Sequence, residues 1–358
     1  MKYNFRVERT TTPKPKPDPD TLEFGKVFSD HMFLMNYSTK KSWYDGRIVP
    51  YGTISLDPAA AVFHYGQEMF EGMKAYRTPD RRVQLFRPYM NAARAEASNT
   101  RMCMPVIEQD LFVEAIRALV DVERDWIPEK PNTSLYIRPF VIADDPFLGV
   151  KAADTYIFII ICSPVGPYYN IPGGGMAPTK IFVEDEFVRA AVGGVGYAKV
   201  GGNYGASLKA QSNAVKYGCA QVLWLDGVEH SYVEEIGTSN AFFMINDEVI
   251  TAPLLGTILP GVTRASVIEL LKKWDIKVSE RRLRIGDVVK AADDGSLKEI
   301  FASGTAAVIS PVGELKFKDS SITIADGGVG PVAQRLYDTL YGIQTGTLAD
   351  DMGWTLQV

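Results

Sequence analysis

Apolar residues recur along the chain with two different periods, which predicts a mixture of helices and strands. Over 110–126 they fall three and four residues apart, so that they would line one face of a helix. The same reasoning predicts further helices at 206–217, which Gly218 would end, at 263–274 and at 329–341.

Other apolar runs are short, rich in β-branched and aromatic residues, and typical of strands. They predict strands at 134–143, 155–161, 180–185, 220–226 and 241–245. The last of these would turn at Asn246-Asp247. Strands and helices follow one another without the regular strand–helix–strand repetition of a doubly wound sheet, and the pattern therefore favours an α+β fold.

Two stretches interrupt the composition of the 358-residue chain, a length that suits about two domains. Residues 1–20 are polar and carry alternating prolines, which predicts an extended, mobile tail. Residues 164–178 place prolines on both sides of a triple glycine, which neither a helix nor a central strand tolerates. We therefore expect a small N-terminal domain at 21–166, an inter-domain loop at 167–178 and a large C-terminal domain at 179–358.

Composition excludes several classes of function. The net charge is −5 and no long run of Lys or Arg exists, which argues against nucleic acid or an anionic membrane surface as a partner. The longest strongly apolar run, 156–162, is too short to cross a bilayer. The widely spaced Cys103, Cys162 and Cys219 predict buried thiols in a reducing, cytoplasmic compartment.

Most catalytic motifs with a known mechanism are absent from the sequence. It contains no phosphate loop of the GxxxxGK[ST] type, no GxGxxG after a strand, no GxSxG and no HExxH. His31, His64 and His230 stand apart without metal-ligand spacing, and no metal site is expected.

The segment AAVGGVGYAKVGGNYG at 190–205 carries the strongest chemical signal. Its one charged residue is Lys199, and burial among glycines and apolar groups would lower the pKa of this amine from about 10.4 toward neutrality. A neutral amine is the form that Schiff-base chemistry requires. The residues alone leave open a second interpretation, a flexible surface loop with a solvated lysine.

Two other groups of residues suggest an anionic ligand. In VEEIGTSN (233–240), an acid followed by Gly-Thr-Ser would place a carboxylate beside a ring nitrogen and backbone N–H groups around a phosphate, although ordinary turns have the same composition. In the first half of the chain, Arg87 or Arg94 would anchor a phosphate among aromatic residues. A packed core with Arg side chains extending to its surface remains an alternative for the second group.

Together, and in this order, these segments resemble the branched-chain amino acid aminotransferases, the pyridoxal-phosphate enzymes of fold type IV. The resemblance is carried by FGKVFSDHM (24–32), FEGMKAY (70–76), LFRPYMNAAR (85–94), SLYIRP (134–139), GGVGYAKVGGNYG (193–205), QVLWLDG (221–227), EEIGTSN (234–240), LPGVTR (259–264) and SGTAA (303–307). It extends from about residue 21 to the C-terminus. It implies a two-domain α+β fold with a smaller N-terminal α/β domain and a larger C-terminal domain with a mainly β core.

The resemblance implies a pyridoxal 5'-phosphate cofactor bound covalently to Lys199 as an internal aldimine. Lys199 would also shuttle the proton, Tyr204 would lie near the phenolic oxygen, Glu235 would pair with the pyridine nitrogen, and Arg94 would bind the phosphate. The other cofactor-binding residues implied are Arg189, Gly237, Thr238, Leu254, Gly256, Thr257, Ile258 and Thr305.

The resemblance also implies a substrate site. Its members would be Phe24, Tyr65, Phe70, Tyr136, Arg138, Val150, Tyr168, Thr305 and Ala306. Tyr65 and the backbone of Thr305 and Ala306 would hold the α-carboxylate, while the aromatic residues enclose the side chain. Val150 would reach the pocket of a second subunit, because the relatives are homodimers. Mammalian members carry a redox CxxC after SGTA, whereas this chain has Ala307 and Ser310 there, so no thiol switch is expected.

The implied reaction transfers the amino group of L-leucine, L-isoleucine or L-valine to 2-oxoglutarate by a ping-pong aldimine/ketimine mechanism. Two relatives of the same fold, the D-amino-acid aminotransferases and the aminodeoxychorismate lyases, use the same lysine and glutamate and remain alternatives. A non-catalytic pyridoxal-phosphate-binding protein is a further alternative.

Overall fold

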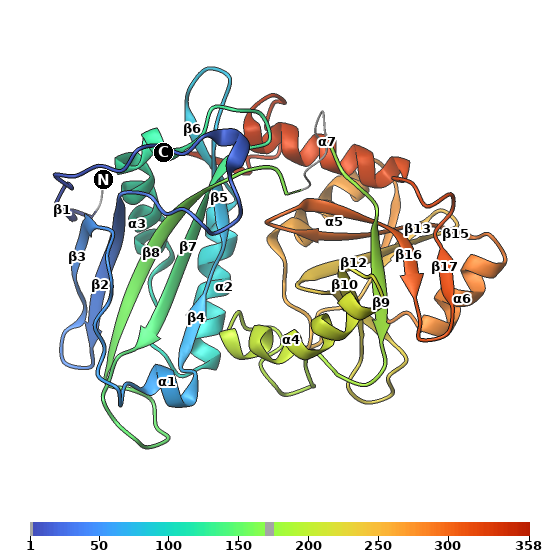
Figure 1. Cartoon of the computed structure of the whole chain (residues 1–358), viewed down its shortest axis with the longest axis horizontal. Helices are drawn as coiled ribbons and strands as arrows, with labels where there is room; N and C mark the ends of the chain where they lie inside the picture. Colours follow the sequence, from blue (N-terminus) through green and yellow to red (C-terminus); the bar gives the residue numbers. More distant parts are fainter. Residues whose placement is uncertain (1–2, 169–174) are drawn as a thin grey trace. The chain divides into compact units, whose positions relative to one another are not determined.

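A computed structural model of the chain describes residues 3–168 and 175–358 (Figure 1). This described part divides into two compact units. The first contains the described residues of Met1–Tyr168 together with Ala198–Gly201 and Gly342–Val358, and the second contains those of Tyr169–Tyr197 and Gly202–Tyr341. Sheets and helices occur in both units, which confirms the α+β class. Of the expected inter-domain loop at 167–178, residues 169–174 lie outside the described residues.

The first unit is built on one mixed sheet. Its elements are β1 (Arg6–Val7), η1 (Pro19–Thr21), β2 (His31–Ser38), β3 (Ser42–Pro50), α1 (Ala61–Tyr65), β4 (Glu68–Phe70), β5 (Met73–Arg77), β6 (Val83–Phe86), α2 (Pro88–Arg101), α3 (Gln109–Val122), η2 (Arg124–Trp126), β7 (Ser134–Ala143), β8 (Thr155–Val165) and β18 (Thr355–Gln357). The strand order is β1-β3-β2-β8-β7-β5-β6-β18, with β4 also paired to β7. All of these pairs are antiparallel except β1–β3.

Alternation along β7 separates the two faces of this sheet. Ile137 and Val141 are fully buried, and Val141 pairs with Phe158 of β8, which stacks on Phe112 of α3. This face therefore packs against the helices, which run along the sheet in Figure 1. Residues one step along the strand point the other way. On this opposite face, Tyr136 and the alternate residues of β7 that follow it are only half-buried, and the face carries several residues of the candidate site.

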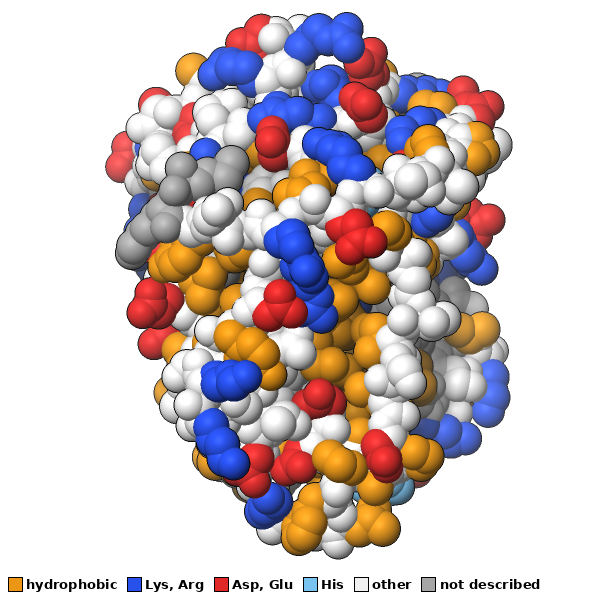
Figure 2. All heavy atoms as spheres, turned by 90° about the vertical axis from the view of Figure 1, so that its left-hand side faces the viewer, with side chains coloured by type: hydrophobic (Ala, Val, Ile, Leu, Met, Phe, Trp, Pro, Cys, Tyr) orange, Lys and Arg blue, Asp and Glu red, His pale blue; other side chains and the backbone are white. Residues whose placement is uncertain are grey.

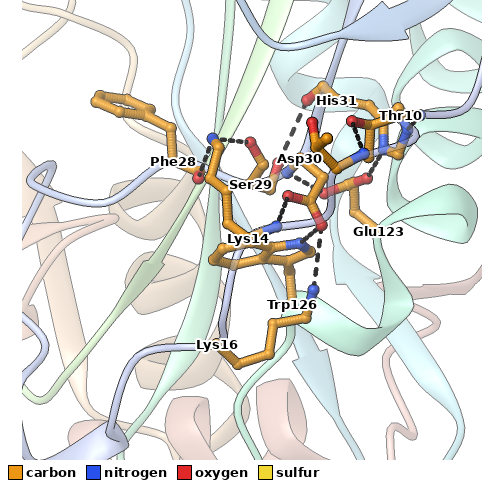
Figure 3. Close-up of polar contacts among 10 residues, drawn as sticks. Thr10, Lys14, Lys16, Phe28, Ser29, Asp30, His31, Glu123 and Trp126 are labelled. Atoms are coloured by element: carbon orange, nitrogen blue, oxygen red, sulfur yellow. Dashed lines mark hydrogen bonds and ion pairs between the residues drawn. The ribbon is translucent and has the colours of Figure 1, made fainter.

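The N-terminal segment, expected to be a mobile tail, has contacts in the structure that its prolines do not predict. Lys14 donates its backbone N–H to Asp30 Oδ1 at 2.9 Å, and Lys16 Nζ lies 3.3 Å from Asp30 Oδ2 and 4.0 Å from the Trp126 ring centroid. Upstream, β1 pairs with β3, and Thr10 N–H donates to His31 Nε2 (Figure 3). The prolines keep the segment extended, but lysines two residues apart reach the same buried carboxylate and fix it to the unit.

The second unit contains its own sheet. Its elements are β9 (Thr179–Glu184), α4 (Gly201–Lys216), β10 (Gln221–Leu225), β11 (Val233–Ile236), β12 (Ser239–Ile245), β13 (Glu248–Thr251), α5 (Val262–Lys273), β14 (Lys277–Glu280), α6 (Ile285–Asp293), β15 (Leu297–Gly304), β16 (Val308–Lys316), β17 (Ser321–Thr323) and α7 (Pro331–Thr345). The strand order is β11-β10-β9-β16-β15-β12-β13-β14, and β17 pairs with β16. Because β11 also pairs with β12, the strands from β11 to β12 in this order close into a ring, and β13 and β14 continue beyond it.

Both faces of these strands are covered. Leu223, Phe243 and Ile300 belong to a buried cluster that also holds Val288 and Ala291 of α6. Alternate residues of β9 and β10 point away from this cluster and pack with α4 in a second one. The strands are apolar nearly throughout because neither face meets solvent, and this explains why they read as continuous apolar runs.

The expected helices and strands named above are present within a few residues of their predicted bounds. The end of the chain differs from its expected domain. The C-terminal domain was expected to extend to 358, but β18 pairs with β6 in the sheet of the first unit. Cys162 and Cys219 are buried, whereas Cys103 is exposed, contrary to the expectation of buried thiols. In the described part of the chain, no helix has the length and apolar character needed to cross a membrane.

Candidate functional site

Lys199 lies in the first unit, just before α4, and its backbone is fixed on both sides. Its N–H donates to Ser98 Oγ at 2.9 Å, and its carbonyl accepts from Phe70 N–H at 3.0 Å. Two residues later, Gly201 N–H donates to the Glu68 carboxylate. The Lys199 ammonium nitrogen lies 4.7 Å from the centroid of the Phe70 ring. Lys199 is therefore held in place, and the interpretation of a flexible surface loop is wrong.

A buried ion pair stands beside this amine. Arg94 donates from Nε to Glu71 Oε1 at 2.7 Å and from Nη2 to Glu71 Oε2 at 2.8 Å. Asn91, one turn earlier on α2, donates to the same Oε2 at 2.8 Å. Burial, and after it the positive charge of Arg94, lower the pKa of Lys199 to about 8, although Glu71 opposes this change. The uncharged form of the amine is therefore accessible near neutral pH.

Arg94, expected to bind a phosphate, is buried on α2 and directs both arms of its guanidinium to Glu71. This bidentate geometry fixes the plane of the guanidinium. Arg94 also lies close enough to Lys199 for its positive charge to lower the pKa of the amine. Its role in phosphate binding stays a prediction.

Aromatic residues and an arginine gather on the open face of the same sheet. The Phe24 ring packs edge-on against Tyr136 with 4.8 Å between centroids. Arg138 donates to the Tyr136 hydroxyl at 3.2 Å, and its guanidinium carbon lies 4.8 Å from the Phe70 centroid. A side chain at Gly72 would collide with the Tyr136 hydroxyl. The expected substrate residues Phe24, Phe70, Tyr136 and Arg138 therefore form one cluster.

Three other expected substrate residues are exposed. Tyr65 ends α1 with 40% of its surface exposed, Val150 is 89% exposed, and Tyr168 is 55% exposed. The Tyr65 ring contacts the neighbouring His64 ring, with 6.2 Å between centroids. The structure shows no arrangement that would test their expected roles, which remain predictions.

In the second unit, Arg189 and Glu235 form a buried pair. Arg189 Nε lies 2.7 Å from Glu235 Oε2, and Glu235 Oε1 accepts from Leu259 N–H at 2.8 Å and from Asn240 Nδ2 at 3.0 Å. The Asn240 amide also donates to the Leu259 carbonyl at 2.9 Å. A guanidinium and two neutral donors on one buried carboxylate favour its charged form. The expected partnership of Glu235 with a ring nitrogen stays a prediction.

The turn at Gly256-Thr257-Ile258 is anchored to the same pair. Arg189 Nη1 donates to the Thr257 carbonyl at 2.6 Å, and both Nη atoms lie 3.2 Å from the Gly196 carbonyl. Gly256 has a φ of 99°, which favours glycine. A Cβ on Gly196 would lie 2.6 Å from the Thr257 carbonyl oxygen and 2.9 Å from its Cα. The glycine-rich segment therefore packs directly on this turn.

The remaining expected cofactor and substrate residues of the second unit occupy turns and element ends. Gly237 takes a φ of 57° in the turn between β11 and β12, and the adjacent Thr238 is exposed. Leu254 is 46% exposed, and Thr305 and Ala306 follow β15 as half-buried residues. Tyr204 is half-buried on α4. Their contacts with a cofactor or substrate stay predictions.

Sequence reasoning missed two buried carboxylates, Glu71 and Glu234. Glu71 is fully buried on Arg94, and Glu234 accepts from the Thr257 hydroxyl at 2.6 Å. Both stand within the motifs quoted above, FEGMKAY and EEIGTSN, but an acid in a motif does not reveal its partner. Among the described residues, no group of His, Cys, Asp and Glu side chains has the arrangement of a metal site.

The sequence is similar to known proteins over its whole length. A family profile described as amino-transferase class IV matches residues 68–315. The chain is 55% identical over 357 residues to branched-chain-amino-acid aminotransferase 2 of Bacillus subtilis (strain 168), covering 100% of this chain and 98% of that protein. It is 45% identical to the branched-chain-amino-acid aminotransferase of Mycolicibacterium smegmatis, covering 98% and 97%.

The structure is also similar to solved ones. It aligns with the branched-chain amino acid aminotransferase from Escherichia coli with a TM-score of 0.73 and 27% identity, covering 92% of this chain and 98% of that one. It aligns with the branched-chain amino acid aminotransferase from Thermobaculum terrenum, solved in its PLP-form, with a TM-score of 0.73 and 22% identity, covering 91% and 97%. At this lower identity, the second likeness shows the fold alone.

Proposed function

Because the chain belongs to the amino-transferase class IV family, we propose that it transfers the amino group of L-leucine, L-isoleucine or L-valine to 2-oxoglutarate. The products are the branched 2-oxo acid and L-glutamate. Full-length relatives at 55% and 51% identity are named for branched-chain amino acids. The observation that carries the chemistry is the amine of Lys199, whose pKa burial lowers to about 8 beside the Glu71–Arg94 pair.

The residues present fit pyridoxal 5'-phosphate, the cofactor we propose for this reaction. Lowering the pKa of Lys199 from 10.5 to about 8 raises the uncharged fraction at neutral pH a few hundred-fold, because each unit of pKa changes this fraction roughly tenfold. An uncharged amine suits a covalent link to an aldehyde. Glu235, an anion paired with Arg189, suits a protonated ring nitrogen. The left-handed residue of a glycine turn at 256–258 suits backbone binding of a phosphate.

We propose a cofactor contact for each residue that matches the family's motifs. Lys199 would bind it covalently, and Tyr204 would lie near its phenolic oxygen. Phosphate and ring contacts would come from Arg94, Arg189, Glu235, Gly237, Thr238, Leu254, Gly256, Thr257, Ile258 and Thr305. The support for these assignments is the match of this chain to the family's motifs and, for Lys199, Glu235 and the turn, their surroundings described above.

Each reactive residue then has one task. When bound, pyridoxal phosphate withdraws electrons from the carbon that carries the amino group. The uncharged Lys199 amine removes the proton from this Cα atom, and the Phe70 ring keeps water from one side of the amine. Glu235 holds a proton at the ring nitrogen because its carboxylate is paired with a guanidinium.

One substrate pocket must accept both an apolar side chain and the second carboxylate of 2-oxoglutarate. Phe24, Phe70 and Tyr136 offer apolar surface for the branched side chain. Arg138, stacked on Phe70 and bonded to the Tyr136 hydroxyl, offers a guanidinium for the carboxylate. In this proposal the remaining contacts come from Tyr65, Val150, Tyr168, Thr305 and Ala306.

Purified protein supplied with pyridoxal phosphate tests this function. L-leucine with 2-oxoglutarate should give L-glutamate, whereas Lys199→Ala should give none and should lose the borohydride-trapped adduct. Lys209→Ala, which alters an exposed lysine on α4, serves as the control. Normal turnover by Lys199→Ala would refute the assignment. Formation of D-glutamate, or cleavage of aminodeoxychorismate, would replace it with one of the alternatives of the same fold.

We also propose that the protein acts as a homodimer in the cytoplasm. Exposed hydrophobic residues gather on α1 and on the loop after β7, where Phe63, Phe147, Leu148 and Val150 are between 47% and 89% exposed. Figure 2 shows hydrophobic side chains, coloured orange, at the lower end of the face that it draws. An apolar patch of this kind suits a second copy that receives Val150. Free cysteines at 103, 162 and 219 suit a reducing compartment.

A further inference from the structure

The turn at Gly256-Thr257-Ile258 is held by more than the Arg189–Glu235 pair. Arg189 binds the Thr257 carbonyl, and Glu235 binds the N–H of Leu259, just after the turn. Both of these contacts reach backbone atoms. The side chain of Thr257 has a separate anchor, since its hydroxyl donates to Glu234 Oε1 at 2.6 Å.

Glu234 is buried at a cost to the fold. Its side chain is 7% exposed, and among the described residues its second oxygen, Oε2, finds no hydrogen-bond partner. Burial, with smaller contributions from the carboxylates of Glu235 and Asp226, raises the pKa of Glu234 to about 7, although the hydrogen bond from Thr257 and the charge of Arg189 both lower it. A carboxyl group in this position is unfavourable compared with an apolar side chain of similar size.

The cavity beside Glu234 and Thr257 bears on which side chains position 234 would accept. Glu234 and Thr257 line a cavity of about 210 Å³ together with Tyr232, Asp226 and Arg282. An apolar residue at 234 would be accommodated without an unpaired oxygen. What it would not provide is an acceptor for the Thr257 hydroxyl, and this acceptor is therefore the property that the carboxyl contributes.

We propose that Glu234 is a positioning residue that orients the Gly256-Thr257-Ile258 turn for binding the cofactor phosphate, acting through the hydroxyl of Thr257. This inference rests on the proposed function, which assigns the turn to pyridoxal phosphate. Glu234 does not touch the cofactor in this proposal. Its contribution is to fix the Thr257 side chain, and with it the backbone N–H groups of the turn.

The test measures the affinity of cofactor-free protein for pyridoxal phosphate, followed by absorbance, together with the melting temperature of the same cofactor-free samples. Glu234→Leu removes the acceptor, Thr257→Val removes the donor, and a double variant combines them. Glu234→Gln keeps an acceptor oxygen of the same shape. Glu229→Gln, which changes an exposed carboxylate on the wall of the same cavity, is the matched control.

We expect Glu234→Leu and Thr257→Val each to weaken binding roughly tenfold, equivalent to about 1.4 kcal/mol. The double variant should lose no more than either single one, because both remove the same hydrogen bond. Glu234→Gln should rescue most of the affinity, Glu229→Gln should match the parent protein, and the melting temperature of cofactor-free Glu234→Leu should be unchanged or higher.

Three results would overturn the inference: unchanged affinity in Glu234→Leu, additive losses in the double variant, or a loss of affinity that parallels a loss of cofactor-free stability. Each of these can be observed only if the parent protein binds pyridoxal phosphate. Failure of the parent protein to bind it would instead overturn the proposed function and this inference together, so the two failures are distinguishable.

Discussion

Replacing Lys199 with methionine should make the cofactor-free protein more stable near neutral pH, although it abolishes transamination. Methionine retains the length of the lysine side chain and removes its charge. The charge is unfavourable in the native protein because burial and Arg94 both favour the uncharged amine. In the unfolded chain the same amine is solvated and carries its proton at no such cost.

The magnitude follows from the pKa. A fall from 10.5 to about 8, at about 1.4 kcal/mol per pH unit, amounts to roughly 3 kcal/mol between the protonation states. Methionine loses the contact of the ammonium group with the Phe70 ring, a cation–π interaction of about 0.5–1 kcal/mol. The free energy of unfolding should therefore rise by about 2–2.5 kcal/mol at pH 7.

The sign of the pH dependence provides a second check. Between about pH 8 and 10.5 the unfolded chain holds a proton on Lys199 that the native protein has released. Stability of the parent protein should therefore increase with pH across this window, and the full penalty applies below pH 8. Burial likewise lowers the pKa of Lys74 to about 8, so Lys199→Met should retain part of the increase.

Urea unfolding of cofactor-free protein at pH 7 and at pH 10 measures both effects. The cofactor must be absent, since a ligand bound to the native state adds its own stability. Lys209→Met, at an exposed position, is the control and should change little. If Lys199→Met is no more stable than the parent at pH 7, or if its advantage does not shrink toward pH 10, then the amine is not held in an unfavourable charged state.

Other substitutions should show equally defined effects. Glu71→Gln leaves the buried guanidinium of Arg94 without its anion and should reduce the free energy of unfolding by about 3–5 kcal/mol in urea melts. Gly196→Ala forces a Cβ against the turn at 256–258, which we propose binds the cofactor, and should weaken pyridoxal-phosphate binding at equilibrium, whereas Gly202→Ala, with open space around it on α4, should bind normally. Asp30→Ala removes the acceptor of both N-terminal lysines, and limited proteolysis should then cleave within 8–20 in a protein whose parent resists it there.

Local patterns were sufficient for most elements of the fold. The strand predicted at 134–143 is confirmed as β7, Ser134–Ala143. It could be predicted because its residues alternate between a buried face and an open face of the sheet. The N-terminal segment and β18 depend instead on distant partners, Asp30 and β6. A local sequence pattern indicates which secondary structure a segment forms by itself. Contacts with distant residues can fix a polar, proline-rich segment whose own sequence favours neither a helix nor a strand.

The site shows the same division. Lys199 stood out because one charge among glycines and apolar residues is rare, and the structure supplies the burial that such a residue needs to react. Glu71 and Glu234 gave no comparable signal, since carboxylates are common and their importance lies in one contact each. Their partners, Arg94 and Thr257, are 23 residues away in each case, beyond the reach of any helical or strand period.

Lys199 and Glu235, the two groups that we propose to take part in the reaction, need opposite electrostatic surroundings, and each has an arginine beside it. Beside Lys199, the positive charge of Arg94 disfavours a second positive charge, so the amine releases its proton more readily. Beside Glu235, the positive charge of Arg189 favours the carboxylate. The buried positive charge of Arg94 would destabilise the fold without a counter-ion, and the Glu71 carboxylate is that counter-ion. Glu71 therefore raises the pKa of Lys199 and yet allows Arg94 to lower it, so a substitution at 71 should alter reactivity and stability together.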